Sequence, residues 1–151
     1  MASTQDQYDL RIHSKPENVS KVEPFLEKIN TRLGLNEVEY HKLLVGTTEA
    51  VNNAIIHGNK SDPDKYVTVT VQIRKHYIIV SISDEGGGFN PEEIPNPLDE
   101  ENLLKESGRG LFLMQTLMDE VEIHSNETGC EVRMSLYTGP KSGLKDSEPT
   151  E

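Results

Sequence analysis

Residues 47–58 read TTEAVNNAIIHG and place three polar side chains, Glu49, Asn53 and His57, at four-residue intervals. On an α-helix, residues four apart lie on one face, so this spacing predicts a carboxylate, an amide and an imidazole in one line. The apolar residues of the same stretch occupy the adjoining arc, which should face the core. The polar line is therefore expected to border a cleft, although taken alone it would equally suit a solvated flank of the helix.

The helix that carries this line is expected to begin after Asn36 and to end near Ile56 or His57. The segment NEVE at residues 36–39 predicts a capping box, in which the side chains of Asn36 and Glu39 bond to each other's backbone N–H groups. Gly58 follows the last apolar residues, where glycine commonly ends a helix.

Outside this helix, the spacing of the apolar residues is typical of a helix in some segments and of a β-strand in others. Apolar residues at helical spacing predict an earlier helix over residues 19–33, with a break or kink at Pro24, and a later one over residues 111–118. Period-two patterns predict strands over residues 9–13, 66–74, 77–84, 120–125 and 130–137. We expect the last four of these strands to pair as two hairpins. This order predicts an α+β domain, with a mainly antiparallel sheet and helices on one face.

Composition narrows the class of protein. The chain has 151 residues and a net charge of −11, so we expect one domain that repels nucleic acid and anionic membranes. A single cysteine, Cys130, excludes an internal disulfide. Because no apolar run of membrane-spanning length and no signal peptide occur, a cytoplasmic location is expected. We predict a domain over residues 1–138 and a disordered tail over residues 139–151.

The second informative stretch is SDEGGG at residues 83–88. A predicted strand ends at Asp84, and three consecutive glycines, including Gly86 and Gly88, follow almost at once. One glycine suffices for a tight turn, so three indicate a close approach to bare backbone or a loop that moves. The Asp84 carboxylate could accept a hydrogen bond from an amine such as the exocyclic group of adenine. The alternative is a hairpin connection with a turn-forming aspartate.

The third stretch is KESGRG at residues 105–110, directly before the later apolar helix. Gly108 and Gly110 at a helix start would leave backbone N–H groups free for an anion, and Lys105 and Arg109 add positive charge. An ordinary helix cap would look similar. Neither a Walker loop nor a dinucleotide-binding glycine pattern is present.

Together the three stretches resemble the Bergerat ATP-binding fold, which gyrase, histidine kinases and mismatch-repair ATPases share. The order is E-x-x-x-N on a helix, D-x-G-x-G after a strand and G-x-G opening a later helix, and the resemblance spans residues 36–137. The segments EAVNNAIIHGN and SGRGLFLMQTLMDEVEI are most similar to those of bacterial anti-sigma factor serine kinases. The fold implied is a two-layer sandwich.

The resemblance also implies roles. Glu49 would act as the general base, Asn53 would hold the Mg²⁺ that bridges the ATP phosphates, and Asp84 would accept from the adenine amino group. The other residues implied at the nucleotide are His57, Gly86, Gly88, Lys105, Gly108, Arg109, Gly110 and Cys130. The implied protein phosphorylates an anti-anti-sigma factor, sequesters a sigma factor, contacts neither DNA nor membrane, and pairs as a possible homodimer.

Two positions depart from the family pattern. Glu106 stands where some members have an arginine that reaches the γ-phosphate, so Lys105 or Arg109 would have to take that role. Cys130 stands where relatives often have threonine, and a thiol is a poorer hydrogen-bonding group than a hydroxyl. A second hypothesis therefore stays open, a non-catalytic ATP-binding regulatory module that switches partner binding. A third is an α+β domain without a ligand.

Overall fold

The protein is built on one antiparallel sheet with the strand order β1-β2-β3-β5-β4. The computed structural model describes residues 7–86 and 106–138, and residues 1–6, 87–105 and 139–151 lie outside that description. The strands are β1 (Gln7–His13), β2 (Tyr66–Ile73), β3 (Tyr77–Asp84), β4 (Glu120–Asn126) and β5 (Gly129–Tyr137). Every neighbouring pair is antiparallel. The predicted hairpins are β2–β3 and β4–β5.

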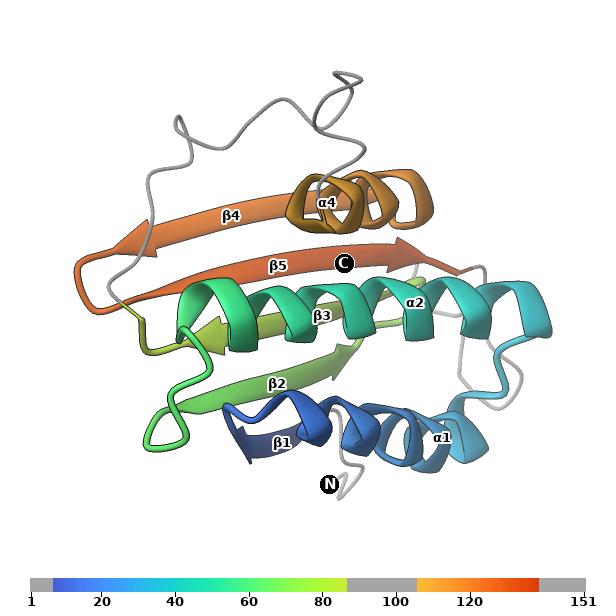
Figure 1. Ribbon diagram of the computed structural model, residues 1–151. Coiled ribbons are helices and arrows are strands. Elements are labelled where there is room, and N and C mark those ends of the chain that lie inside the picture. Colours follow the sequence, from blue (N-terminus) through green and yellow to red (C-terminus); the bar gives the residue numbers. More distant parts are fainter. Residues whose placement is uncertain (1–6, 87–105, 139–151) are drawn as a thin grey trace.

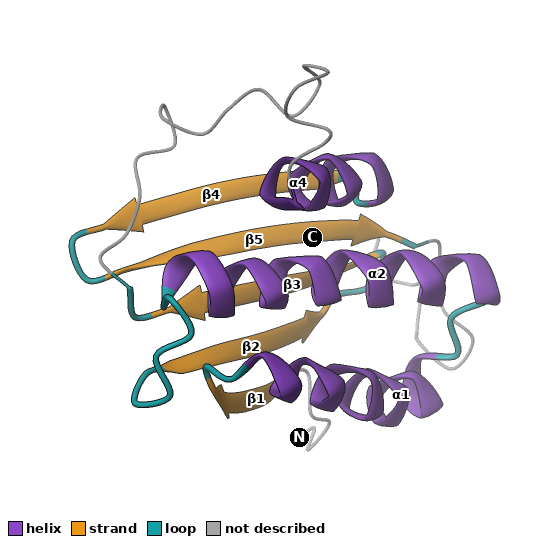
Figure 2. Ribbon diagram, viewed as in Figure 1, coloured by secondary structure: helices purple, strands orange, loops and turns teal. Residues whose placement is uncertain are grey.

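The helices cover one face of this sheet. Figure 1 shows α2 running across the middle strands, with α1 on the side of β1 and β2 and α4 on the side of β4 and β5. In Figure 2 the helices form one layer and the strands the other. The helical elements are η1 (Pro16–Lys21, a 3-10 helix), α1 (Val22–Leu33), α2 (Glu37–Asn53), η2 (Ala54–Gly58, a π-helix) and α4 (Glu106–Leu117). The predicted α+β two-layer fold is confirmed.

The core lies between the two layers, as the period-two pattern predicts. Along β2 and β3 each buried residue is followed by a half-buried one, and Val69 and Val80 on the buried side are 0% exposed. The helices meet them with residues such as Leu43 and Ile55, also 0% exposed. Burying one such side chain contributes about 1.5–3 kcal/mol, so this shared face fixes which side of the sheet α2 covers.

The helix starts follow local sequence signals. Asn36 Oδ1 accepts from the Glu39 backbone N–H at 2.7 Å, and the Asn36 N–H donates to Glu39 Oε1 at 3.2 Å, so the predicted capping box is present. The predicted break near Pro24 is also present, since η1 gives way to α1 at Val22. Pro24 then lies in the first turn of α1, where a missing N–H costs no helical hydrogen bond.

Two helix boundaries differ from the prediction. The regular part of α2 stops at Asn53, and η2 continues it with wider turns, in which the Asn59 N–H donates to the Ala54 carbonyl at 2.8 Å. Helix α4 starts at Glu106 rather than near residue 111, so Gly108 and Gly110 lie inside its first turns. Glycine lowers helix propensity, but packing against a neighbouring helix overrides propensity.

Other expectations fall outside the described residues. Most of the loop predicted between the second hairpin strand and the later helix belongs to residues 87–105, and the predicted tail is residues 139–151. The domain boundary and the disorder of the tail stay predictions. No helix within the described ranges is long and apolar enough to cross a membrane.

Candidate functional site

The first part of the candidate site lies where α2 and α4 meet. Glu49 and Asn53, both half-buried, project from one face of α2 toward the start of α4. A β-carbon at Gly110 would lie 2.9 Å from Glu49 Oε1 and 3.3 Å from Asn53 Nδ2. The backbone of α4 therefore comes close to both side chains at this glycine, and a larger residue would require them to move.

The two side chains bring a carboxylate and an amide close to the first turns of α4. Among the side chains that the structure describes, none forms a hydrogen bond with the Glu49 carboxylate or the Asn53 amide. A buried face usually pairs its polar groups, so a half-buried carboxylate and amide left without partners are available for a ligand. Such oxygen donors suit a hard cation such as Mg²⁺.

The second part of the site is the carboxyl end of β3, where Asp84 lies against bare backbone. A β-carbon at Gly58 would overlap Asp84 Oδ2, one at Gly86 would overlap the Gly58 carbonyl oxygen, and one at Gly129 would overlap the Asp84 carbonyl oxygen. Three glycines from the end of η2, the end of β3 and the start of β5 therefore enclose one aspartate. This close approach explains why these turns need glycine.

The surroundings of Asp84 hold its carboxylate in one orientation. Its Oδ1 accepts from the Gly86 N–H at 3.0 Å and from the Cys130 N–H at 3.2 Å. Burial raises the pKa of Asp84, while these two hydrogen bonds and the nearby charge of Lys65 act in the opposite direction. Both backbone donors therefore bind Oδ1, and Oδ2 lies on the side of Gly58.

Cys130 contributes its backbone to this region rather than a charged sulfur. Its side chain is 5% exposed. Burial, followed by the negative charges of Asp84 and Glu131, raises the pKa of the thiol to about 12. The thiol is therefore neutral at physiological pH, and it cannot act as a nucleophile or bind a metal as a thiolate.

The predicted site residues fall into separate groups in the structure. Glu49, Asn53 and Gly110 come together between α2 and α4, and Asp84, Gly86 and Cys130 come together at the end of β3. The roles of both groups stay predictions. The wider turns of η2 displace His57 from the line that a continuous α-helix would give, and its side chain is exposed.

The remaining predicted residues are less closely defined. Arg109 is exposed on α4, and Gly108 is part of the backbone of the same helix. Gly88 and Lys105 lie outside the described residues. In the described ranges no cluster of three or more histidine, cysteine, aspartate or glutamate side chains could hold a metal ion.

Sequence analysis missed three residues that shape the site. Gly58 is predicted only to end a helix, and no site role is predicted for Gly129, whereas both lie against Asp84. Asn59 receives no prediction of its own, yet it is completely buried. A polar residue directly after a helix-ending glycine gives no signal of burial, because its partners come from distant parts of the chain.

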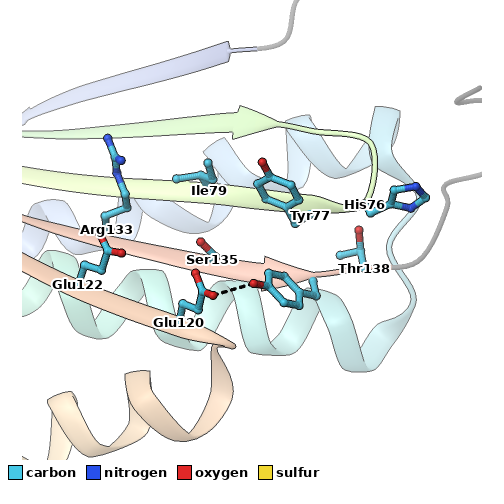
Figure 3. Close-up of a pocket in the computed structure, with 9 residues that line it drawn as sticks. His76, Tyr77, Ile79, Glu120, Glu122, Arg133, Ser135 and Thr138 are labelled. Atoms are coloured by element: carbon cyan, nitrogen blue, oxygen red, sulfur yellow. Dashed lines mark hydrogen bonds between the residues drawn. The ribbon is translucent and has the colours of Figure 1, made fainter. Parts of the chain in front are cut away.

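A broad groove lies on the opposite face of the sheet, away from both parts of the candidate site. Figure 3 shows Tyr77 and Ile79 of β3 on one side of the groove, Glu120 and Glu122 of β4 on the other, and Ser135 of β5 between them. The Tyr137 hydroxyl donates to Glu120 Oε2 at 2.7 Å, and this hydrogen bond is the main cause that raises the pKa of Tyr137. None of the predicted site residues lines this groove.

Comparison with known proteins agrees with this geometry. A model of the histidine kinase-like ATPase domain matches residues 12–136. The serine-protein kinase RsbW of Listeria innocua is 31% identical over 147 residues, which cover 93% of this chain and 93% of that protein. The RsbW of Staphylococcus epidermidis is 31% identical over an alignment of 158 residues, covering 100% of this chain and 99% of that protein.

Solved structures share the fold at lower identity. The RsbU and RsbW domains of a Mycobacterium tuberculosis protein superpose with a TM-score of 0.64 at 15% identity, over 91% of this chain and 33% of that one. The mycobacterial sensor histidine kinase MprB gives a TM-score of 0.53 at 16% identity, over 88% of this chain and 99% of that one. The chain therefore belongs to the histidine kinase-like ATPase domain family and, within it, to the RsbW-type serine-protein kinases.

Proposed function

We propose that this protein is a cytoplasmic serine kinase that uses Mg-ATP to phosphorylate an anti-anti-sigma factor and that sequesters a sigma factor. The observation that carries this proposal is the contact of Gly110 with both Glu49 and Asn53. It brings a carboxylate, an amide oxygen and the first turns of a helix to one place. The names of the curated relatives support the kinase activity, and the partners follow from the same family.

Glu49 is the general base of the proposed reaction. The hydroxyl oxygen of the substrate serine forms a bond to the γ-phosphorus of ATP while the bond to the bridging oxygen breaks, and ADP leaves with that electron pair. Glu49 takes the hydroxyl proton. A positioned base of this kind typically contributes about 10²–10⁴-fold to the rate. Glu49 is half-buried, so its side chain is still partly open to a substrate hydroxyl.

Asn53 is the proposed ligand for Mg²⁺. An amide oxygen beside a carboxylate is a donor set that fits this ion, which keeps several waters and phosphate oxygens around it and needs few protein ligands. When bound, the ion neutralises phosphate charge and orients the γ-phosphoryl group. Helix α4 contributes backbone N–H groups in its first turn, and Arg109 on its exposed side adds the positive charge that the Glu106 position lacks.

Asp84 is the proposed adenine contact. Its Oδ1 is occupied by the backbone N–H groups of Gly86 and Cys130, so Oδ2 is the acceptor for the exocyclic amino group. A half-buried, preoriented acceptor distinguishes adenine from guanine, because guanine presents a carbonyl oxygen at the corresponding position. Gly58 and Gly86 allow the end of η2 and the end of β3 to pack closely against each other beside Asp84.

One experiment tests the proposal directly. The protein is titrated with Mg-ATP and Mg-ADP while its melting temperature is measured, and labelled ATP is then supplied with a candidate anti-anti-sigma protein. Saturating nucleotide at about 100 times its dissociation constant should add about 2.7 kcal/mol to the free energy of unfolding. Label on a serine of the partner supports the kinase. A protein that ignores adenine nucleotides contradicts the proposal.

A second candidate function is a regulatory module that binds ATP without transferring phosphate. Glu106 in place of an arginine and the neutral Cys130 thiol in place of a hydroxyl favour it. This hypothesis predicts the same melting shift with Mg-ATP and tight binding of a partner, but no label on that partner. A homodimer is compatible with either function, and the oligomeric state is measured by light scattering.

A further inference from the structure

Asn59 is a completely buried polar residue that follows the site glycine Gly58 directly. Its side-chain Nδ2 donates to Ser14 Oγ at 2.6 Å and to the Tyr66 carbonyl at 2.9 Å. Its Oδ1 accepts from the Glu85 N–H at 2.8 Å. An asparagine amide offers two donor hydrogens and one acceptor oxygen, so every kind of hydrogen bond it can make is made here.

This single side chain joins segments that are distant in sequence. Ser14 follows β1, Tyr66 begins β2 and Glu85 follows β3. The backbone N–H of Asn59 also donates to the Ala54 carbonyl at 2.8 Å, which ties the same residue to the end of the α2–η2 helix. Removing the side chain would take away the acceptor of the Glu85 N–H, whose hydrogen bond to Asn59 is part-buried.

The network lies directly behind the proposed adenine contact. Glu85, held by Asn59 Oδ1, is the neighbour of Asp84 in the chain. Gly58, the residue before Asn59, lies against Asp84 Oδ2 on one side and against Gly86 on the other. The position of the Asp84 carboxylate relative to η2 is therefore set by the link between residues 58–59 and residues 84–86.

The chemistry of this position is specific for asparagine. Aspartate would retain an acceptor for the Glu85 N–H but would bring a negative charge toward the Tyr66 carbonyl oxygen. Serine would be too short to reach the three partners, which lie on different strands. A purely space-filling residue would satisfy none of them.

We propose that Asn59 is a positioning residue for base recognition: by holding the Glu85 N–H, it fixes the Asp84 carboxylate against the end of η2 and so sets the preference for adenine. The inference rests on the proposed function, in which Asp84 accepts from the adenine amino group. Asn59 does not contact the nucleotide itself in this proposal. It acts through the backbone of the β3 end.

The test compares Asn59→Ala with the matched control Ser14→Ala. Each variant removes one partner from the same buried network, but only Asn59→Ala releases the Glu85 N–H. Dissociation constants for Mg-ATP and Mg-GTP are measured together with the melting temperature. We expect Asn59→Ala to bind Mg-ATP about tenfold more weakly, equal to about 1.4 kcal/mol, and to lose part of its preference over Mg-GTP. Ser14→Ala should melt earlier and keep both dissociation constants within about twofold.

An unchanged dissociation constant for Mg-ATP in a folded Asn59→Ala protein would overturn the inference. So would a Ser14→Ala variant that loses the adenine preference to the same degree, because general loosening of the fold would then explain both. In case Asn59→Ala does not fold, hydrogen exchange is followed at the Glu85 amide of the unaltered protein. Strong protection is expected, and exchange at the rate of an exposed amide would contradict the hydrogen bond.

The Asp84→Asn variant separates this inference from the proposed function. If Asp84→Asn binds Mg-ATP as tightly as the unaltered protein, the adenine assignment fails, and the role of Asn59 fails with it. If Asp84→Asn loses adenine nucleotides while Asn59→Ala does not, the adenine contact stands and only the positioning role is lost. Weakened adenine binding in both variants, with Ser14→Ala unaffected, supports the inference.

Discussion

The two parts of the candidate site are built in different ways. At the end of β3, Asp84 is held by two backbone hydrogen bonds and enclosed by glycines from three turns. Between α2 and α4, Glu49 and Asn53 touch Gly110 and have no side-chain hydrogen bond within the described part of the chain. The proposed base-binding end is preorganised, whereas the proposed phosphate end consists of side chains that are free to adjust to a ligand.

This difference follows from the tasks that the two ends would perform. A base is recognised by a fixed donor–acceptor pattern, and preorganisation reduces the ordering cost of binding. Phosphate groups change charge and position during transfer, so the groups around them must stabilise more than one arrangement. Substitutions at each end therefore test whether one end is rigid and the other adjustable.

The largest effect is expected at the phosphate end. Glu49→Gln keeps the size of the side chain but removes the base, so we expect phosphoryl transfer to fall by about 10²–10⁴-fold with little change in the dissociation constant of Mg-ATP. Transfer of label to the partner protein and nucleotide titration measure the two quantities. Glu37→Gln, on the exposed first turn of the same helix, is the matched control and should be unaffected. Transfer at the original rate in Glu49→Gln would exclude Glu49 as the base.

Alanine at two glycines tests the contrast in rigidity. In Gly58→Ala the new β-carbon overlaps Asp84 Oδ2, whose carboxylate is held by backbone donors and cannot move aside. We expect a loss of about 1–3 kcal/mol in unfolding free energy, with a matching loss of adenine binding. In Gly110→Ala the β-carbon would lie 2.9 Å from Glu49 Oε1, at the end of a flexible side chain.

Gly110→Ala should therefore be the milder change for stability. The Glu49 side chain can rotate away, and alanine improves helix propensity by up to about 1 kcal/mol, so the melting temperature should change little. The cost should appear instead in the rate of phosphoryl transfer. Melting temperatures of Gly58→Ala and Gly110→Ala, measured without nucleotide, compare the two effects on stability. A larger fall in melting temperature for Gly110→Ala than for Gly58→Ala would mean that the phosphate end is the rigid one.

The sequence predicts the elements of this molecule much better than it predicts their contacts. The four-residue spacing of Glu49 and Asn53, the capping box at Asn36 and the alternation along β2 are local patterns, and local patterns determine which face of an element is buried. The pairing of strands into hairpins follows from the short turns between them. These features recovered the two-layer fold.

What the sequence did not predict depends on distant segments. The contact of Gly58 with Asp84 and the burial of Asn59 arise only when the end of a helix meets the ends of three strands. The early start of α4 has the same origin, because the helix gains from packing what its glycines lose in propensity. A polar turn residue and a buried network residue look alike until strand order is known.

A pH dependence is expected at the base-binding end. The pKa of Asp84 is raised by burial, so the folded protein takes up this proton at a higher pH than the unfolded chain. Asp84 therefore favours the folded state most at acid pH, and this contribution is lost as the pH rises through the folded pKa. Adenine binding should show the opposite trend, because only the ionised carboxylate is a full acceptor for the amino group.

Mg-ATP affinity should accordingly weaken as the pH falls from neutral through the raised pKa of Asp84, by about tenfold or less. Titrations over a pH series measure it. The same series on Asp84→Asn is the control, since the protonation of the nucleotide phosphates is common to both proteins. Identical pH dependence in the two proteins would show that Asp84 does not titrate in contact with the base.

The smallest effect is expected at Cys130, whose backbone rather than its side chain serves the site. The raised thiol pKa of about 12 leaves almost no thiolate at neutral pH. Iodoacetamide should therefore modify the folded protein far more slowly than the urea-unfolded chain, as followed by mass spectrometry.

Cys130→Thr keeps the backbone donor to Asp84 and adds a hydroxyl, so it should change Mg-ATP affinity by only a few-fold, toward tighter binding. Rapid alkylation of the folded protein, or loss of nucleotide binding in Cys130→Thr, would mean that the base-binding end opens in solution, and the contrast between a rigid and an adjustable end would no longer hold.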